Sequence, residues 1–163
     1  ACSLASRRSV RAQAAGAANV LTFEADGSIE ADNTDGLGMV RDLEAHGIAL
    51  PGRRVMMLGA GGAARGVVPA LLDAGVAGIV VVNRTAAKAA SLVESFAGYG
   101  NVSAHDPATP CASACDLLVN ATSAGLTSAT PPPVPPGAAD ADTACYDLVY
   151  GSGETAFMAW ARD

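Results

Sequence analysis

The sequence predicts an α/β protein with a doubly wound parallel sheet. From residue 54 onward, short apolar runs of strand length alternate with segments of helical pattern. The run 79–82 is apolar throughout, as in a parallel strand that is covered on both faces. A glycine-dense turn joins the first run to a helical segment rich in small residues. With 50% hydrophobic and 16% charged residues, a chain of 163 residues can bury one full core.

The residues before 54 predict two helices and a β-hairpin. The helices are expected over 9–15 and 34–47, and the hairpin strands over 16–23 and 28–31. Asp26-Gly27 is a favoured hairpin turn, and Asn33 or Thr34 is a suitable N-cap for the second helix. Pro51-Gly52 then ends this part of the chain before the main sheet begins.

The remaining residues predict five strands and three helices. The strands are expected over 55–58, 79–83, 101–104, 115–120 and 143–150, and the helices from the glycine turn to 74, over 85–96 and over 154–162. Pro69 is expected in the first turn of its helix or at a kink, because proline disrupts a helix interior. Residues 105–114 form a polar connection with room for a short helix, and the proline-rich run 130–136 predicts a loop.

The glycine turn has the pattern of a dinucleotide-binding, Rossmann-like unit, G-x-G-x-x-G/A, with Ala64 in the last position. Gly59 allows the tight turn, and Gly61 has no Cβ to keep a pyrophosphate from the backbone. The free N–H groups at the start of the helix then face the phosphates. The alternative is a glycine turn that binds no ligand.

The end of the second strand predicts NADP rather than NAD. In this fold an acidic side chain there binds the ribose hydroxyls of NAD, whereas a basic one accepts a 2′-phosphate. Here Asn83, Arg84 and Thr85 follow the strand, and Lys88 lies one helical turn later. Cations are mildly unfavourable at a helix N-terminus, so their presence there favours a phosphate ligand. The alternative is that Arg84 and Lys88 are simply solvated.

Composition and charge argue against several other functions. The net charge of −6, with no cluster of basic residues, argues against nucleic-acid binding. The 4 cysteines lack paired metal-ligand spacing, so we expect reduced thiols and no metal. No leader or membrane-spanning run is recognisable, which predicts a cytoplasmic protein that does not bind membranes. A homodimer is compatible with the sequence, which does not fix the oligomeric state.

Six motifs in order resemble those of the shikimate dehydrogenases, NADP-dependent enzymes of aromatic amino-acid and chorismate biosynthesis that interconvert 3-dehydroshikimate and shikimate. The motifs are Gly16-Ala-Ala-Asn19, Asp32-Asn-Thr-Asp35-Gly36, Gly59-Ala-Gly-Gly-Ala63, Asn83-Arg-Thr85, Asn120-Ala-Thr-Ser-Ala-Gly125 and Tyr146-Asp-Leu-Val-Tyr150 with Glu154-Thr155. The resemblance extends from about residue 11 to residue 163. It implies an oxidoreductase that transfers a hydride between NADP and its substrate.

The resemblance also implies roles for individual residues. Asn19 and Tyr150 would contact substrate, and Asp35 would also bind it as the acidic, catalytic member of a Lys–Asp pair. The cofactor would be bound by Gly59, Ala60, Gly61, Gly62 and Ala63 at the pyrophosphate, by Asn83, Arg84, Thr85 and Lys88 at the 2′-phosphate, and by Asn120, Thr122, Ser123 and Leu148 near the nicotinamide.

Parts of the family pattern are missing. The family has a substrate domain with a serine pair and a catalytic lysine, but the only lysine here is Lys88. The family's C-terminal segment, with a glutamine that contacts substrate, is also missing. We therefore expect residues 1–31 to be the remnant of a substrate domain that exposes apolar surface, 32–50 a linking helix, and 51–163 a truncated NADP-binding domain.

Two hypotheses follow for the function of the chain. It is either the cofactor portion of an NADP-dependent shikimate dehydrogenase or a module that binds NADP without turnover. A quinate/shikimate dehydrogenase that uses NAD is a further alternative, against which Asn83-Arg84-Thr85 argues.

Overall fold

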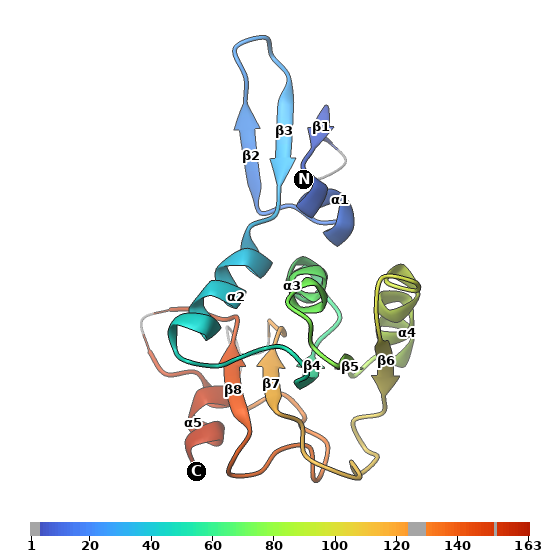
Figure 1. The fold of residues 1–163 in the computed structure, drawn as a ribbon, viewed down its shortest axis with the longest axis vertical. Coiled ribbons are helices and arrows are strands. Elements are labelled where there is room, and N and C mark those ends of the chain that lie inside the picture. The colour runs from blue at the N-terminus through green and yellow to red at the C-terminus, as the bar shows by residue number, and fades with distance from the viewer. Residues whose placement is uncertain (1–3, 124–129, 152) are drawn as a thin grey trace.

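The computed structural model describes residues 4–123, 130–151 and 153–163, and contains two separate sheets. A small sheet formed by the first part of the chain lies at one end of the molecule, and a large sheet with its helices lies at the other (Figure 1). Helix α2 (Asp35–Ala45) connects the two in sequence and in space.

The large sheet has the predicted doubly wound, parallel topology. Its strands are β4 (Arg54–Leu58), β5 (Gly78–Val82), β6 (Val102–His105), β7 (Leu117–Asn120) and β8 (Ala144–Asp147). Their order is β6-β5-β4-β7-β8, and every neighbouring pair is parallel. The chain thus builds outward from β4 on one side and returns to β4 to build the other side. This confirms the α/β fold class, Rossmann-like, and places a topological switch point between β4 and β7.

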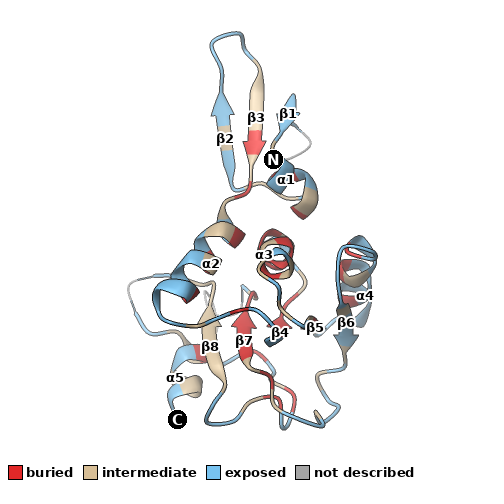
Figure 2. Ribbon diagram, viewed as in Figure 1, coloured by how far each residue is buried: buried red, intermediate tan, exposed pale blue. Residues whose placement is uncertain are grey.

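Alternate residues of the central strands fill a core on each face of the sheet. Val55 and Met57 pack in one core with helices α3 (Gly62–Asp73) and α4 (Ala86–Ser95), whereas Met56 and Leu58 pack in the other. The second core is covered by Phe157 of helix α5 (Ala156–Arg162) and by the segment around Ala138. Burial on both faces explains the continuous apolar runs of these strands, of which β7 is buried over its whole length (Figure 2).

The small sheet contains the predicted hairpin and one unpredicted strand. β2 (Val20–Phe23) pairs antiparallel with β3 (Ile29–Asp32), while β1 (Arg7–Arg8) pairs parallel with β3 on its other side. Helix α1 (Val10–Ala15) forms where a short helix was expected, and Ser9 caps it, because its Oγ accepts from the Ala12 N–H at 3.0 Å. Two residues are too short to show strand periodicity, so β1 was not recognisable in the sequence.

Asp32 fixes the end of the small sheet against α1. Its carboxylate accepts hydrogen bonds from Arg11 and Ser9, which hold the pKa of Asp32 below its usual value. Apolar side chains nevertheless remain exposed here, with Val10 81% and Phe23 74% exposed. The expected apolar surface on this part of the chain is therefore present.

Three expectations about the helices and strands differ from the structure. Pro69 lies in the interior of α3, where it is buried, and not in the first turn. The missing N–H costs one helical bond to Arg65, but the ring contributes to the packed face. Residues 105–114 contain no helix, and β8 ends at Asp147 because its side chain accepts from the Val149 N–H and turns the chain.

Helices α2 and α3 are in close contact at Gly36 of α2. A Cβ at Gly36 would lie 2.6 Å from the Ala70 Cβ and 2.8 Å from the Gly66 carbonyl oxygen. Because one of these atoms is backbone, the neighbour cannot yield by a side-chain rotation. Residue 36 must therefore be glycine for α2 to lie on α3 in this way.

We predict that Gly36→Ala lowers the free energy of unfolding by about 1–3 kcal/mol through overpacking. Gly38→Ala is the matched control, since Gly38 lies in the same helix and a Cβ there meets nothing within 4 Å. The control is expected to stabilise the protein by roughly 0.5–1 kcal/mol, because alanine is the better helix former. Chemical denaturation measures both, and equal stability of the two variants would contradict the close crossing.

Candidate functional site

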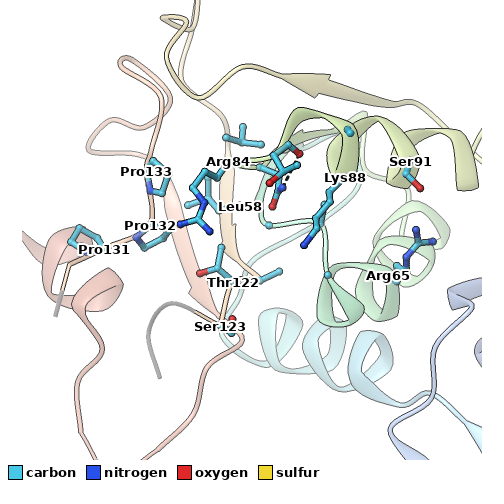
Figure 3. A pocket seen from close by; sticks show the side chains of 18 of the residues that line it. Leu58, Arg65, Arg84, Lys88, Ser91, Thr122, Ser123, Pro131, Pro132 and Pro133 are labelled. Atoms are coloured by element: carbon cyan, nitrogen blue, oxygen red, sulfur yellow. Dashed lines mark hydrogen bonds between the residues drawn. The ribbon is translucent and has the colours of Figure 1, made fainter. Parts of the chain in front are cut away.

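A cavity of about 900 Å³ lies at the carboxyl ends of the central strands, at the switch point. Three segments line it: the glycine turn after β4, the start of α4 after β5, and the segment after β7. A fourth wall comes from Pro131, Pro132 and Pro133 (Figure 3). Ligands of open parallel sheets bind in this position.

The glycine turn meets both geometric requirements of a phosphate-binding turn. Gly59 has φ +106°, and a Cβ there would lie 2.9 Å from the Ala121 carbonyl oxygen. A side chain is therefore excluded by conformation and by contact. Gly61 and Gly62 are exposed, and a Cβ at either would meet nothing within 4 Å. Open space thus lies in front of the backbone where a ligand would approach.

Helix α3 begins inside this turn. Gly61 is its N-cap, and within the described residues no side chain caps it. Its first N–H groups therefore have no intrahelical acceptor, and the positive end of the helix dipole lies at Gly62. Ala64 is fully buried against the core, which allows the close packing of helix on strand. Gly59, Ala60 and Gly61 line the cavity, whereas Gly62 and Ala63 are not among its lining residues.

The predicted basic residues lie on the second wall. Asn83, Arg84, Thr85 and Lys88 all line the cavity, and Arg84 and Lys88 are exposed. In the part of the chain that the structure describes, neither cation forms an ion pair. Figure 3 shows the Arg84 guanidinium extending toward the prolines across the cavity. The cavity therefore has a local positive charge in a protein of net charge −6.

Hydrogen bonds order this second wall. Asn83 Nδ2 donates to the Thr85 carbonyl at 2.9 Å, which closes the loop that leads into α4. Arg65 also lines the cavity, but its guanidinium donates to Ser95 Oγ at 2.9 Å on α4. Arg65 thereby links α3 to α4 on the same wall as Arg84 and Lys88.

The residues predicted for the nicotinamide end have different positions. Thr122 and Ser123 line the cavity. Asn120 is fully buried and does not line it, and its side chain instead bonds Thr122 and Asp147. Leu148 is half-buried and packs against the main core, whereas Tyr150 is 94% exposed. Residues 124 and 125 of the Asn120 motif lie outside the described residues.

The two remaining predicted residues form a separate cluster at the start of α2. Asn19 Nδ2 donates to Asp35 Oδ1 at 2.6 Å, although the residues are 16 positions apart. Asn33 is buried and accepts from the Asp35 N–H at 3.2 Å. A Cβ at Gly66 would lie 3.3 Å from Asp35 Oδ2, so the cluster rests directly on α3. The same helix thus carries the glycine turn at its start and Asp35 against its side.

Several residues of the two sites were not predicted from the sequence. The prolines at 131–133 were interpreted only as a loop, because no sequence signal shows that a loop folds back over a cavity. Ser91, which follows Lys88 by three residues, could have been found from helical spacing. Asn33 was considered only as a helix cap, but its side chain also donates to the Ala17 carbonyl and accepts from the Asp35 N–H.

The pKa shifts of two further titratable groups arise mainly from burial. Burial raises the pKa of the Cys115 thiol to about 11, and burial with a bond to Asp42 raises the pKa of Tyr146. Within residues 4–123, 130–151 and 153–163, no group of three or more His, Cys, Asp or Glu side chains is arranged to hold a metal. None of the helices described there has the length and apolar character needed to span a bilayer.

Comparison with known proteins agrees with this geometry. A family model described as shikimate / quinate 5-dehydrogenase matches residues 43–132. The shikimate dehydrogenase (NADP(+)) of Shewanella halifaxensis is 47% identical over 162 residues, which cover 99% of this chain and 57% of that protein. The enzyme of the same name from Alkalilimnicola ehrlichii is 49% identical, with coverage of 98% and 58%.

A solved structure shows the same fold with ligands bound. Shikimate 5-dehydrogenase from Thermus thermophilus, crystallised with NADP(H) and shikimate, superposes with a TM-score of 0.80 at 35% identity. The match covers 97% of this chain and 57% of that one. The chain thus spans less than two thirds of the length of these relatives. By sequence and by fold, it belongs to the shikimate / quinate 5-dehydrogenase family.

Proposed function

We propose that this chain is the NADP-binding portion of a shikimate dehydrogenase, which interconverts 3-dehydroshikimate and shikimate by hydride transfer. The observation that carries the proposal is the single cavity that brings the glycine turn together with Arg84 and Lys88. The relatives named above are NADP-dependent, and one was crystallised with NADP(H) and shikimate.

The residues of the cavity fit an anionic dinucleotide. The open space before Gly61 and Gly62 admits a pyrophosphate to the free N–H groups of α3. The cations Arg84 and Lys88 lack an internal partner among the described residues, so a phosphate would supply their counter-charge. In the bound state, Gly59 to Ala63 would hold the pyrophosphate, and Asn83 to Lys88 the 2′-phosphate.

The lack of an acidic residue after β5 favours NADP over NAD as the cofactor. A carboxylate at the end of β5 would bind the two ribose hydroxyls of NAD, but this chain has Asn83, Arg84 and Thr85 there. Arginine presents a planar set of donors that matches a phosphate. The same residues argue against the alternative of an NAD-dependent quinate/shikimate dehydrogenase.

At the other end of the cofactor, we assign Asn19, Asp35 and Tyr150 to substrate. NADPH supplies the hydride for reduction of the ketone, and a proton must reach the resulting oxygen. The Asn19–Asp35 pair offers an amide and a carboxylate that can orient substrate hydroxyls. Asp35 also provides a negative charge that would hold a catalytic lysine amine. Thr122 and Ser123, which line the cavity, are assigned to its nicotinamide end, with Asn120 buried behind them and Leu148 packed against the core after β8.

The proposal includes the division of the chain into parts. Residues 1–31 would belong to the substrate lobe, 32–50 to the link between lobes, and 51–163 to the cofactor lobe. A homodimer and a cytoplasmic location stay predictions. The second candidate is a module that binds NADP without turnover. The 163 residues contain one lysine, Lys88, and this favours the second candidate for these residues by themselves.

Arg84→Ala is expected to weaken NADP binding by roughly 10- to 100-fold, because hydrogen bonds to a charged phosphate are lost. NAD, which lacks the 2′-phosphate, should bind both proteins with similar, weaker affinity. Arg162→Ala is the matched control, since Arg162 lies outside the cavity and pairs with Glu154. Titration calorimetry measures these affinities.

Tighter binding of NAD than of NADP by the unchanged protein would contradict the assignment of NADP as the cofactor. Equal losses in the Arg84 and Arg162 variants would show a general charge effect and not a phosphate site.

The 163-residue chain is expected to bind NADP but not to oxidise shikimate. The physical reason is that its only lysine, Lys88, lies in the cofactor cavity, so none remains to pair with Asp35. Absorbance of NADPH at saturating shikimate measures turnover, and intact mass establishes which polypeptide is in the assay. Turnover at an ordinary enzymatic rate by a chain of this mass would refute the need for a lysine beside Asp35. Failure to bind NADP would refute the proposal as a whole.

A further inference from the structure

A buried polar connection lies behind the cavity, at the carboxyl ends of β7 and β8. The Asn120 side chain is fully buried, and its Nδ2 donates to Asp147 Oδ1 at 2.9 Å. Its Oδ1 accepts from the Thr122 N–H at 3.0 Å and from the Thr122 hydroxyl at 2.7 Å. Both ends of the amide are therefore used, and its orientation is fixed by one partner on β8 and one in the segment after β7.

Asp147 joins three segments through one carboxylate. Besides Asn120, its Oδ1 accepts from the Val149 N–H at 3.0 Å, and its Oδ2 accepts from the Thr155 hydroxyl at 2.5 Å. Thr155 in turn caps α5, because its Oγ1 accepts from the Met158 N–H at 3.2 Å. The carboxylate therefore ties the end of β8 to β7, to its own following turn and to α5.

Thr122, at the far end of this connection, lies close to the glycine turn. A Cβ at Gly59 would lie 3.1 Å from Thr122 Cγ2 and 2.9 Å from the Ala121 carbonyl oxygen. Thr122 thus lies between the glycine turn and Asn120, and it lines the cavity. Its position depends on the orientation of the Asn120 amide, and that orientation depends on Asp147.

We infer that Asp147 is a positioning residue for the nucleotide cofactor, because through Asn120 it sets the position of Thr122 in the cavity wall after β7. This inference rests on the proposed function. Asp147 itself does not line the cavity. Arg84 and Lys88 lie on the wall after β5, and no hydrogen bond of the connection reaches them. Loss of Asp147 therefore disturbs only the part of the cofactor that lies beyond the 2′-phosphate.

The test compares NADP with adenosine 2′,5′-bisphosphate, which has the 2′-phosphate end but no nicotinamide. In Asp147→Ala, the affinity for NADP falls roughly tenfold, in keeping with the loss of a bond to a charged group, while the affinity for the bisphosphate changes less than about twofold. Asp147→Asn keeps an acceptor for Asn120 Nδ2 and restores most of the NADP affinity. Thr155→Val, the control, removes the bond from Thr155 to Asp147 and the side-chain cap of α5, but it keeps the Asp147–Asn120 bond and leaves both affinities within about twofold.

Titration calorimetry on folded protein measures the affinity of the unchanged protein and of each variant for both ligands, with circular dichroism to verify folding. If the alanine variant does not fold, Asp147→Ser replaces it, because a serine hydroxyl can accept from the Val149 N–H but is too short to reach Asn120. An equal loss of both ligands, or no loss of NADP affinity, overturns the inference. Failure of the unchanged protein to bind either ligand counts against the proposed function instead.

Discussion

The contact between the glycine turn and the end of β7 is the constraint on which the site depends. Gly59 approaches the Ala121 carbonyl so closely that a Cβ would lie 2.9 Å from it. This approach is available only because β7 lies directly beside β4 in the sheet, where the chain reverses its direction of building. The reversal leaves a crevice at the carboxyl ends of β4 and β7, and the cavity forms there and extends over the end of β5.

Helix α3 connects the cofactor cavity to the small sheet. Its first turn, at Gly62, is directed at the cavity, and one turn later Gly66 accommodates Asn33 and Asp35. The α2 helix crosses it at Gly36, where no larger residue fits without displacement. Asp35 is therefore fixed relative to the glycine turn by one rigid helix. In the proposed function, this fixed position would place Asp35 precisely relative to the cofactor, as hydride transfer requires.

Much of the fold was predictable because the core strands are buried on both faces and glycine marks the turns. The runs 55–58 and 79–82, around Met57 and Val81, contain only apolar residues, so they are recognisable as buried strands. Pro69 does not lie in the first turn of α3, one of its two expected positions, because burial of its ring in the helix interior overrides local helix propensity. Asn120 was predicted as a cofactor ligand by resemblance, but its buried bonds to Thr122 and Asp147 depend on β7 and β8 pairing 27 residues apart. Sequence spacing contains no such information.

The most direct test of the central claim is amide hydrogen exchange at the start of α3, measured by NMR with and without NADP. If the free N–H groups of Gly61, Gly62 and Ala63 bind the pyrophosphate, NADP slows their exchange, because a bonded amide no longer exchanges with water. Amides of β2, far from the cavity, serve as the internal reference and should not change. Unchanged exchange at Gly61 to Ala63 in protein saturated with NADP would contradict the account, since the cofactor would then be bound elsewhere.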